Sequence, residues 1–165
     1  MLTGIFVKES KYRFICDVKI DNKIQECYIS NSSHLLPMIN LVNKKVLLKE
    51  NKGKNLRTKY TLHALFAQNE KVLLNLNYVN NLVQKYLYEI NDANNIKREY
   101  QLGKYKSDFY IIDKNIVIEV KGILSENNSV VFPYKHCERC SWQLKHIINL
   151  LKQGYIVDYY LVLLN

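Results

Sequence analysis

Glycine and proline are scarce in this sequence, with 5 and 2 among 165 residues. Collagen-like and low-complexity chains need many of both, so those classes are excluded. No apolar run approaches the roughly 18 residues that a membrane-spanning helix needs, and residues 1–7 lack the basic start of a signal peptide. With 48% apolar and 24% charged residues, we expect a globular cytoplasmic protein that does not enter a membrane.

The four cysteines do not indicate a disulfide framework. Cys16 and Cys27 lie symmetrically about a possible two-residue hairpin turn at 21–22, so we expect them to face each other as buried apolar fillers. Cys137 and Cys140 form a CxxC motif, but a structural zinc site normally needs a second pair at matching spacing. The role of this motif stays open.

Acidic residues are the minority charge, with 15 Asp and Glu against 24 Lys and Arg, a formal net charge of +9. Such a surplus attracts phosphate backbones. The basic side chains concentrate at 44–59, where a flexible loop could follow a nucleic-acid backbone without reading bases. A solvated charged hairpin is the alternative. The nucleic-acid-binding candidates in this segment are Lys52, Lys54, Arg57 and Lys59.

The first part of the chain has the alternating pattern of short strands. Strands are expected at 11–20, 23–30, 45–50, 60–68 and 71–77, with a short helix or turn at 34–42. Five short strands with one intervening helix are typical of a small barrel, of which the OB-fold is the common nucleic-acid-binding version. We therefore predict an OB-like barrel at residues 1–77.

The hydrophobic period changes after residue 77. Helices are expected at 81–91 and 139–152, and strands at 96–102, 107–112, 116–121 and 155–164. Asn80 or Asn81 is expected to cap the first of these helices. The second domain, residues 78–165, is therefore predicted to have the order helix, three strands, helix, strand, and the whole chain a mixed α/β (α+β) fold.

One predicted hairpin carries the residues that suggest chemistry. Asp108 opens its first strand, while Glu119 and Lys121, two residues apart on the second strand, share a face. If the turn is two residues long, residues 108 and 119 are directly opposed, with Cβ atoms about 4.5–5.5 Å apart. Two such carboxylates can share one Mg²⁺ or Mn²⁺ ion while the lysine orients or helps deprotonate a water. The pattern indicates metal-dependent phosphodiester hydrolysis; a solvated salt-bridged face is the alternative.

The element order with Asp108, Glu119 and Lys121 resembles the PD-(D/E)xK nuclease superfamily and, more closely, the SfsA family of sugar fermentation stimulation proteins. Further segments that carry this resemblance are 13–18, 58–62, 78–82, 107–109, 118–121, 132–133 and 138–139. The resemblance implies an N-terminal OB-like domain, a nuclease domain, metal ligation by Asp108 and Glu119, and catalysis by Lys121.

The resemblance also implies roles for three further residues. Glu99 matches an additional acidic position and is a candidate metal ligand, while an exposed strand carboxylate is the alternative. Gln143 takes the place of a family histidine and is a candidate catalytic residue, although a surface amide is the simpler interpretation. Arg139 is retained from a helix signature that is otherwise lost, and we assign it to nucleic-acid binding.

The sequence therefore predicts a metal-dependent nuclease that acts on DNA or RNA. A non-catalytic DNA-binding protein or regulator on the same scaffold is the main alternative, and an interaction module with incidental charge is the third. An intact set of Asp108, Glu119 and Lys121 favours the enzyme, whereas the altered helix signature favours the regulator. A monomer and a homodimer are both open.

Overall fold

The structure is a computed structural model that describes the chain apart from residues 13, 31–38, 54, 68–69, 125–137 and 165. The chain forms two compact units. The first comprises Met1–Asn77, Ile123–Asn128 and Leu163–Asn165, and the second comprises Tyr78–Gly122 and Ser129–Val162. In the described part of the chain, neither helix is long and apolar enough to span a membrane.

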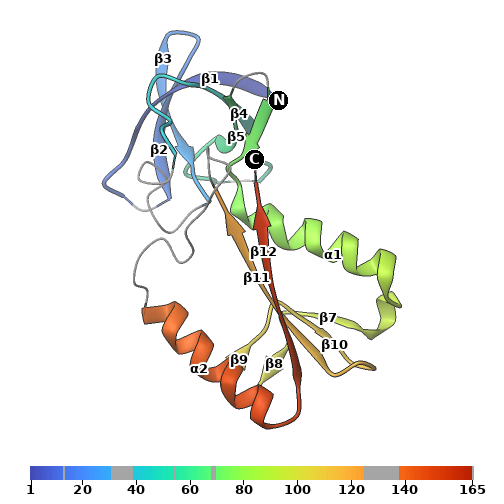
Figure 1. The fold of residues 1–165 in the computed structure, drawn as a ribbon. Coiled ribbons are helices and arrows are strands. Elements are labelled where there is room, and N and C mark those ends of the chain that lie inside the picture. The colour runs from blue at the N-terminus through green and yellow to red at the C-terminus, as the bar shows by residue number, and fades with distance from the viewer. Residues whose placement is uncertain (13, 31–38, 54, 68–69, 125–137, 165) are drawn as a thin grey trace. The chain divides into compact units, whose positions relative to one another are not determined.

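The first unit is a closed five-stranded barrel (Figure 1). Its strands are β1 (Leu2–Glu9), β2 (Ile15–Ile20), β3 (Lys23–Tyr28), β4 (Lys45–Glu50) and β5 (Tyr60–Ala67). The antiparallel series β3-β2-β1-β4-β5 closes on itself because β3 also pairs with β5 in the parallel sense. A further strand, β6 (Glu70–Leu73), extends from β5. The small barrel predicted from the strand pattern is confirmed.

The strand that begins the barrel was not among those predicted. β1 pairs with both β2 and β4, so without it the ring would be open. Gly4 interrupts the apolar pattern of β1. Because glycine is unfavourable within strands, this segment was hard to recognise as a strand from the sequence. The structure gives a reason for this glycine: a Cβ atom there would lie 2.6 Å from Val18 Cγ1 and 2.9 Å from the Lys19 carbonyl oxygen. The predicted strand at 71–77 corresponds to β6, which is outside the ring.

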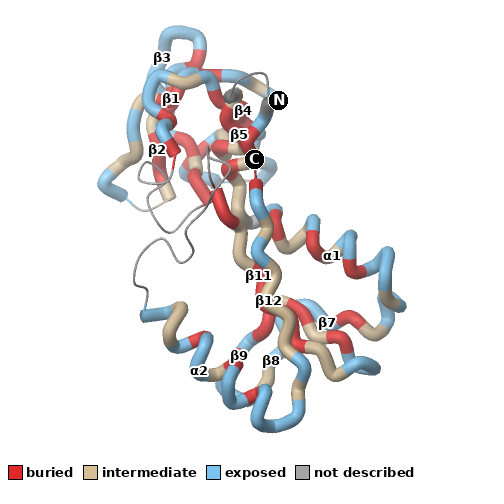
Figure 2. Tube along the Cα trace, in the orientation of Figure 1, coloured by how far each residue is buried: buried red, intermediate tan, exposed pale blue. Residues whose placement is uncertain are grey.

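The β2–β3 hairpin forms in the predicted register. Asp21 and Asn22 have φ values of 46° and 63°, which is the left-handed pair of a type I′ turn. Cys16 then pairs directly with Cys27, and both are buried free thiols, as expected. The barrel interior is visible in Figure 2 as the buried positions along β4 and β5. The helix or turn predicted at 34–42 lies largely outside the described residues.

The second unit contains a four-stranded sheet in the order β12-β11-β10-β7. Its elements are α1 (Val79–Ile90), β7 (Ile96–Arg98), β10 (Phe109–Ile111), β11 (Ile116–Ile123), α2 (Glu138–Lys152) and β12 (Ile156–Leu163), with short 3₁₀ turns η1 (Leu76–Tyr78) and η2 (Ala93–Asn95). β12 runs parallel to β11, since the Ile156 N–H donates to the Asn115 carbonyl and the Leu164 N–H to that of Ile123. For the strands of this four-stranded sheet, the predicted order of helix, three strands, helix and strand is confirmed.

The predicted strand at 96–102 is broken in the structure. Glu99 has a φ of 52°, so the chain turns away after β7 and forms a separate two-stranded hairpin, β8 (Gln101–Leu102) with β9 (Tyr105–Lys106). Tyr105 from this hairpin packs in a buried cluster with Val117 of β11 and with Ile147 and Leu150 of α2. The hairpin therefore helps to hold α2 against the sheet.

Candidate active site

The turn between β10 and β11 sets the spacing of the candidate residues. The Asn115 N–H donates to the Ile112 carbonyl, and Phe109 pairs with Ile118 on the neighbouring strand. One step further along this ladder, Asp108 lies opposite Glu119, which is the register predicted for a two-residue turn. The two carboxyl-bearing residues are therefore brought together by a short local hairpin.

Asp108 is half-buried and held by two donors. Its Oδ1 accepts a hydrogen bond of 2.8 Å from Asn80 Nδ2, and its Oδ2 accepts one of 2.7 Å from the Val120 N–H. Burial raises the pKa of Asp108 and the Glu119 carboxylate adds to this shift, while the Val120 N–H, the Asn80 amide and the Lys121 ammonium oppose it. The two hydrogen bonds thus fix the orientation of the Asp108 carboxylate, but its partners do not fully offset the cost of burying its negative charge.

Asn80 does not cap α1 as the sequence predicted. The helix begins at Val79 after Tyr78, and no side chain caps its first turn. The Asn80 amide is directed to Asp108 instead, so this position serves the site rather than the helix end. The prediction that Asn80 or Asn81 caps the helix was therefore wrong, because the helix begins at Val79 and both asparagines lie inside its first turn rather than at the capping position.

Glu119 is only 2% exposed and lies between two buried apolar neighbours on β11. Its Oε1 accepts hydrogen bonds from Lys121 Nζ and, at 2.8 Å, from Gln143 Nε2, while its Oε2 accepts one from the Tyr105 hydroxyl. A buried carboxylate is costly without such partners. The donors from β9, β11 and α2 therefore stabilise the charge and fix the orientation of Glu119.

Tyr105 is the residue of this site that the sequence analysis did not identify. Burial, followed by the Glu119 carboxylate, raises the pKa of Tyr105 well above its ordinary value, so its hydroxyl stays protonated as a donor. It belongs to β9 of the β8–β9 hairpin and lies in the gap between the strands predicted at 96–102 and 107–112. Its position three residues before Asp108 carries no signal by itself, and only the broken strand brings it to Glu119.

Gln143 and Glu99, two of the candidate residues drawn from the family resemblance, have different surroundings. Gln143 is 8% exposed and bonded to Glu119, so it is not the surface amide that the simpler interpretation expected. The Glu99 carboxylate is exposed and pairs with Lys106 at 2.6 Å, which lowers the pKa of Glu99. Within the described residues, no group of three or more His, Cys, Asp or Glu side chains is arranged to hold a metal ion.

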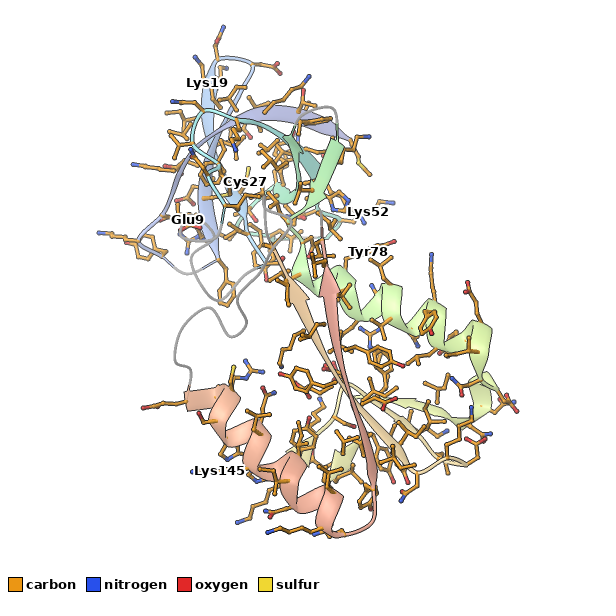
Figure 3. All side chains as sticks on the ribbon, in the orientation of Figure 1. Glu9, Lys19, Cys27, Lys52, Tyr78 and Lys145 are labelled. Carbon is orange, nitrogen blue, oxygen red and sulfur yellow. The ribbon has the colours of Figure 1, made fainter. Side chains whose placement is uncertain are left out.

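The basic candidates of the barrel lie in the loop between β4 and β5. Asn51 anchors this loop, since its Nδ2 donates to the Thr58 carbonyl at 2.9 Å and its N–H to that of Lys59. Lys52 is exposed there (Figure 3), whereas Arg57 lies 3.6 Å from Glu26. Lys59 lies 3.7 Å from Glu50. Lys54 lies outside the described residues, and Arg139 is exposed in the first turn of α2.

Comparison with known proteins identifies similar sequences and similar solved structures. A family model described as the sugar fermentation stimulation protein RE domain matches residues 74–164. Sugar fermentation stimulation protein homologs from Clostridium beijerinckii and Alkaliphilus oremlandii are 29% and 27% identical over 161 and 168 residues. These alignments cover 94% of this chain and 70% and 71% of the relatives. The structure of Pyrococcus furiosus SfsA in complex with Ca²⁺ matches with a TM-score of 0.82 at 17% identity, over 99% of this chain and 72% of that one.

Proposed function

The chain belongs to the SfsA family of sugar fermentation stimulation proteins, and from that premise we propose that it is a divalent-metal-dependent nuclease that hydrolyses phosphodiester bonds of DNA or RNA. The observation that carries the proposal is the convergence of Asp108, Glu119 and Lys121, joined by Gln143. The resemblance to the PD-(D/E)xK nucleases supports the same chemistry. This arrangement puts two carboxylates and one ammonium group together in a partly buried site.

The donor set suits a hard divalent cation such as Mg²⁺ or Mn²⁺. Both oxygens of Asp108 accept one hydrogen bond each, and Glu119 Oε2 accepts one, so each keeps a further lone pair. Mg²⁺ in proteins is commonly held by one or two carboxylates together with water. The relative from Pyrococcus furiosus was solved in complex with Ca²⁺, which also takes oxygen ligands. We infer that Asp108 and Glu119 would hold the ion, and Glu99 is a candidate for a third ligand.

The protein groups have separate parts in the proposed reaction. A bound divalent cation would polarise the phosphate and lower the pKa of an attacking water. Lys121, whose side chain is 22% exposed, can orient that water and offset negative charge that develops on the phosphate. Tyr105 and Gln143 hold Glu119 in one orientation, as Asn80 does for Asp108. Such preorganised partners are what an electrostatic mechanism needs.

A cleavage assay on the wild-type protein tests the proposal. Purified protein is incubated with labelled single-stranded and duplex DNA and RNA in Mg²⁺, Mn²⁺, Ca²⁺ or EDTA, and products are separated by length. We expect cuts with Mg²⁺ or Mn²⁺ and none with EDTA, because hydrolysis depends on the cation. Binding without cleavage under every condition would contradict the proposal.

One observation favours the alternative, a DNA-binding protein or regulator without catalysis. The Glu119 carboxylate already accepts hydrogen bonds from Lys121, Tyr105 and Gln143. These bonds stabilise its buried charge without a cation. A protein that only binds nucleic acid would need no more than this from Glu119. The same cleavage assay separates the two functions, since the regulator would bind in EDTA and never cut.

We also propose that the β4–β5 loop of the barrel binds the nucleic-acid backbone. The corresponding loop of OB-folds is one of their usual binding regions. Lys52 and Arg57 supply positive charge that can contact the phosphates of any nucleic-acid sequence without reading its bases. Arg57 also lies 5.4 Å from the ring of Tyr12, so an aromatic face is close by.

Replacing both Lys52 and Arg57 with alanine is expected to weaken binding of all nucleic-acid sequences alike. Each lost phosphate contact also makes the negative slope of log K against log salt concentration shallower by about 0.7–0.9, because fewer counterions are released. Lys19→Ala is a matched control, since it removes one exposed lysine from β2 (Figure 3). Filter binding over a range of salt concentrations measures the slope. An unchanged slope in the double variant would move the binding surface off this loop.

A further inference from the structure

A column of aromatic rings leads from the surface of α2 to Glu119. The rings of Trp142 and His146 have centroids 3.9 Å apart, and His146 in turn stacks on Tyr105 at 6.3 Å with an interplanar angle of 20°. The Tyr105 hydroxyl donates to Glu119. The column therefore ends at one of the two carboxylates of the candidate active site, and all of it belongs to the second unit.

The outer end of this column is open to solvent. Trp142, the single tryptophan of the chain, is 47% exposed. His146 lies one helical turn after it, and its Nδ1 is 2.9 Å from the Trp142 carbonyl oxygen, which fixes the imidazole against the indole. An exposed apolar residue alone needs no explanation. The indole of Trp142, however, packs against the His146 ring and is exposed, so it offers a surface on which another flat ring can stack.

A pocket of about 370 Å³ lies beside the inner part of the column. His146 and Tyr105 line it together with three amide side chains, those of Gln101, Asn149 and Gln153. Amides can both donate to and accept from the edges of a base, and Lys104, which also lines the pocket, carries the charge that a phosphate needs. The pocket thus adds hydrogen-bonding groups to the stacking face.

We propose that the stacking column and its pocket hold an unpaired nucleobase next to the phosphate that is cut, so that the substrate is single-stranded or has splayed strands. A base within a duplex is stacked on its neighbours and cannot offer its face to Trp142 without being extruded. Aromatic stacking on a basic surface is the usual mode of single-strand binding, and exposed Lys145 on α2 supplies further charge (Figure 3). This inference rests on the proposed function and names its substrate class.

The single tryptophan makes the inference directly measurable. Trp142 fluorescence is followed while a twelve-nucleotide thymidine DNA strand, an abasic strand of equal length, or a blunt duplex is added in EDTA, where metal-dependent cleavage does not occur. We expect the thymidine strand to quench the fluorescence, because its bases stack on the indole. The abasic strand and the duplex are expected to leave it nearly unchanged. Equal quenching by all three, or by none, would overturn the inference.

A pair of variants on α2 provides the second measurement. Trp142→Ala is expected to weaken binding of the thymidine strand by about tenfold, near the lower end of what one stacked base contributes. Trp142→Phe should restore most of that affinity, and Leu144→Ala, which removes an equally exposed apolar side chain, should leave it unchanged. Circular dichroism checks that each variant is folded. Equal affinities of Trp142→Ala and wild type would overturn the inference.

These outcomes are independent of the proposed catalysis. Quenching and a Trp142 effect without cleavage in any metal would uphold the single-strand site and contradict the nuclease. Cleavage without quenching, and with equal rates on single strands and duplex, would uphold the nuclease and overturn the single-strand site.

Discussion

Replacing Lys121 with alanine is expected to lower the cleavage rate by about 10²–10³, the usual effect of removing one preorganised electrostatic group. The ammonium donates to Glu119, and the Lys121 side chain is partly exposed, as the proposed contact with a substrate phosphate requires. Glu119→Gln is expected to cause a loss of similar size, because the amide keeps the shape of the side chain but removes the charge that a cation needs. Single-turnover cleavage in Mg²⁺ measures both rates.

Two controls isolate the chemical step. Both variants should bind nucleic acid about as well as the wild type, since neither residue belongs to the β4–β5 loop. Lys106→Ala removes another lysine that pairs with a glutamate, in this case the exposed Glu99, and should cut normally. If cutting persists in both Lys121→Ala and Glu119→Gln, the activity comes from another site or from a contaminant.

Asp108→Ala is expected to abolish the uptake of Mn²⁺, the second large effect. Removal of this carboxylate leaves Glu119, which is already bonded to three donors, as the remaining ligand of the pair. Isothermal titration calorimetry with Mn²⁺ on the wild type and the variant measures the change. Equal uptake by both proteins would show that the ion binds elsewhere.

The pH dependence of Mn²⁺ binding gives a second reading of the same site. Burial raises the pKa of Asp108, and the cation binds only the ionised carboxylate. Affinity should therefore fall as pH decreases, and the fall should begin at a higher pH than for an ordinary aspartate. Glu99→Ala tests the candidate third ligand: if the Glu99 carboxylate of the wild type stays paired with Lys106 when the cation binds, the variant keeps the wild-type affinity, whereas a loss of affinity would make Glu99 a ligand.

The core of the candidate site could be predicted because it depends on local structure. Asp108 and Glu119 are joined by a tight turn, so the spacing between them sets the pairing, and Lys121 shares a face with Glu119 by simple alternation. Gln143 was found only through the family resemblance, since a helix residue carries no signal for a strand that lies far from it in sequence. Tyr105 was missed because it lies between the two predicted strands, and nothing in the sequence shows that β8 turns back and pairs with β9.

The barrel shows the same limit at the level of the fold. Turn residues and alternation identified most of its strands, including the β2–β3 hairpin with its facing cysteines. β1 was missed because Gly4 weakens its pattern, and its pairing with the distant β4 leaves no local signal. That glycine is explained only by the closeness of Val18 and Lys19, which no local pattern reveals.

The closed ring of the barrel also bears on how the first unit folds. Its seams join β1 with β4 and β3 with β5, which are distant in sequence, so loop-closure entropy opposes them until several strands are in place. The hairpin that carries Asp108 and Glu119 closes through neighbouring residues, which is a fast local event. A substitution that weakens one of these distant strand pairings is therefore expected to destabilise the whole five-stranded ring. The pairing of Asp108 with Glu119 depends instead on contacts between residues that are near in sequence.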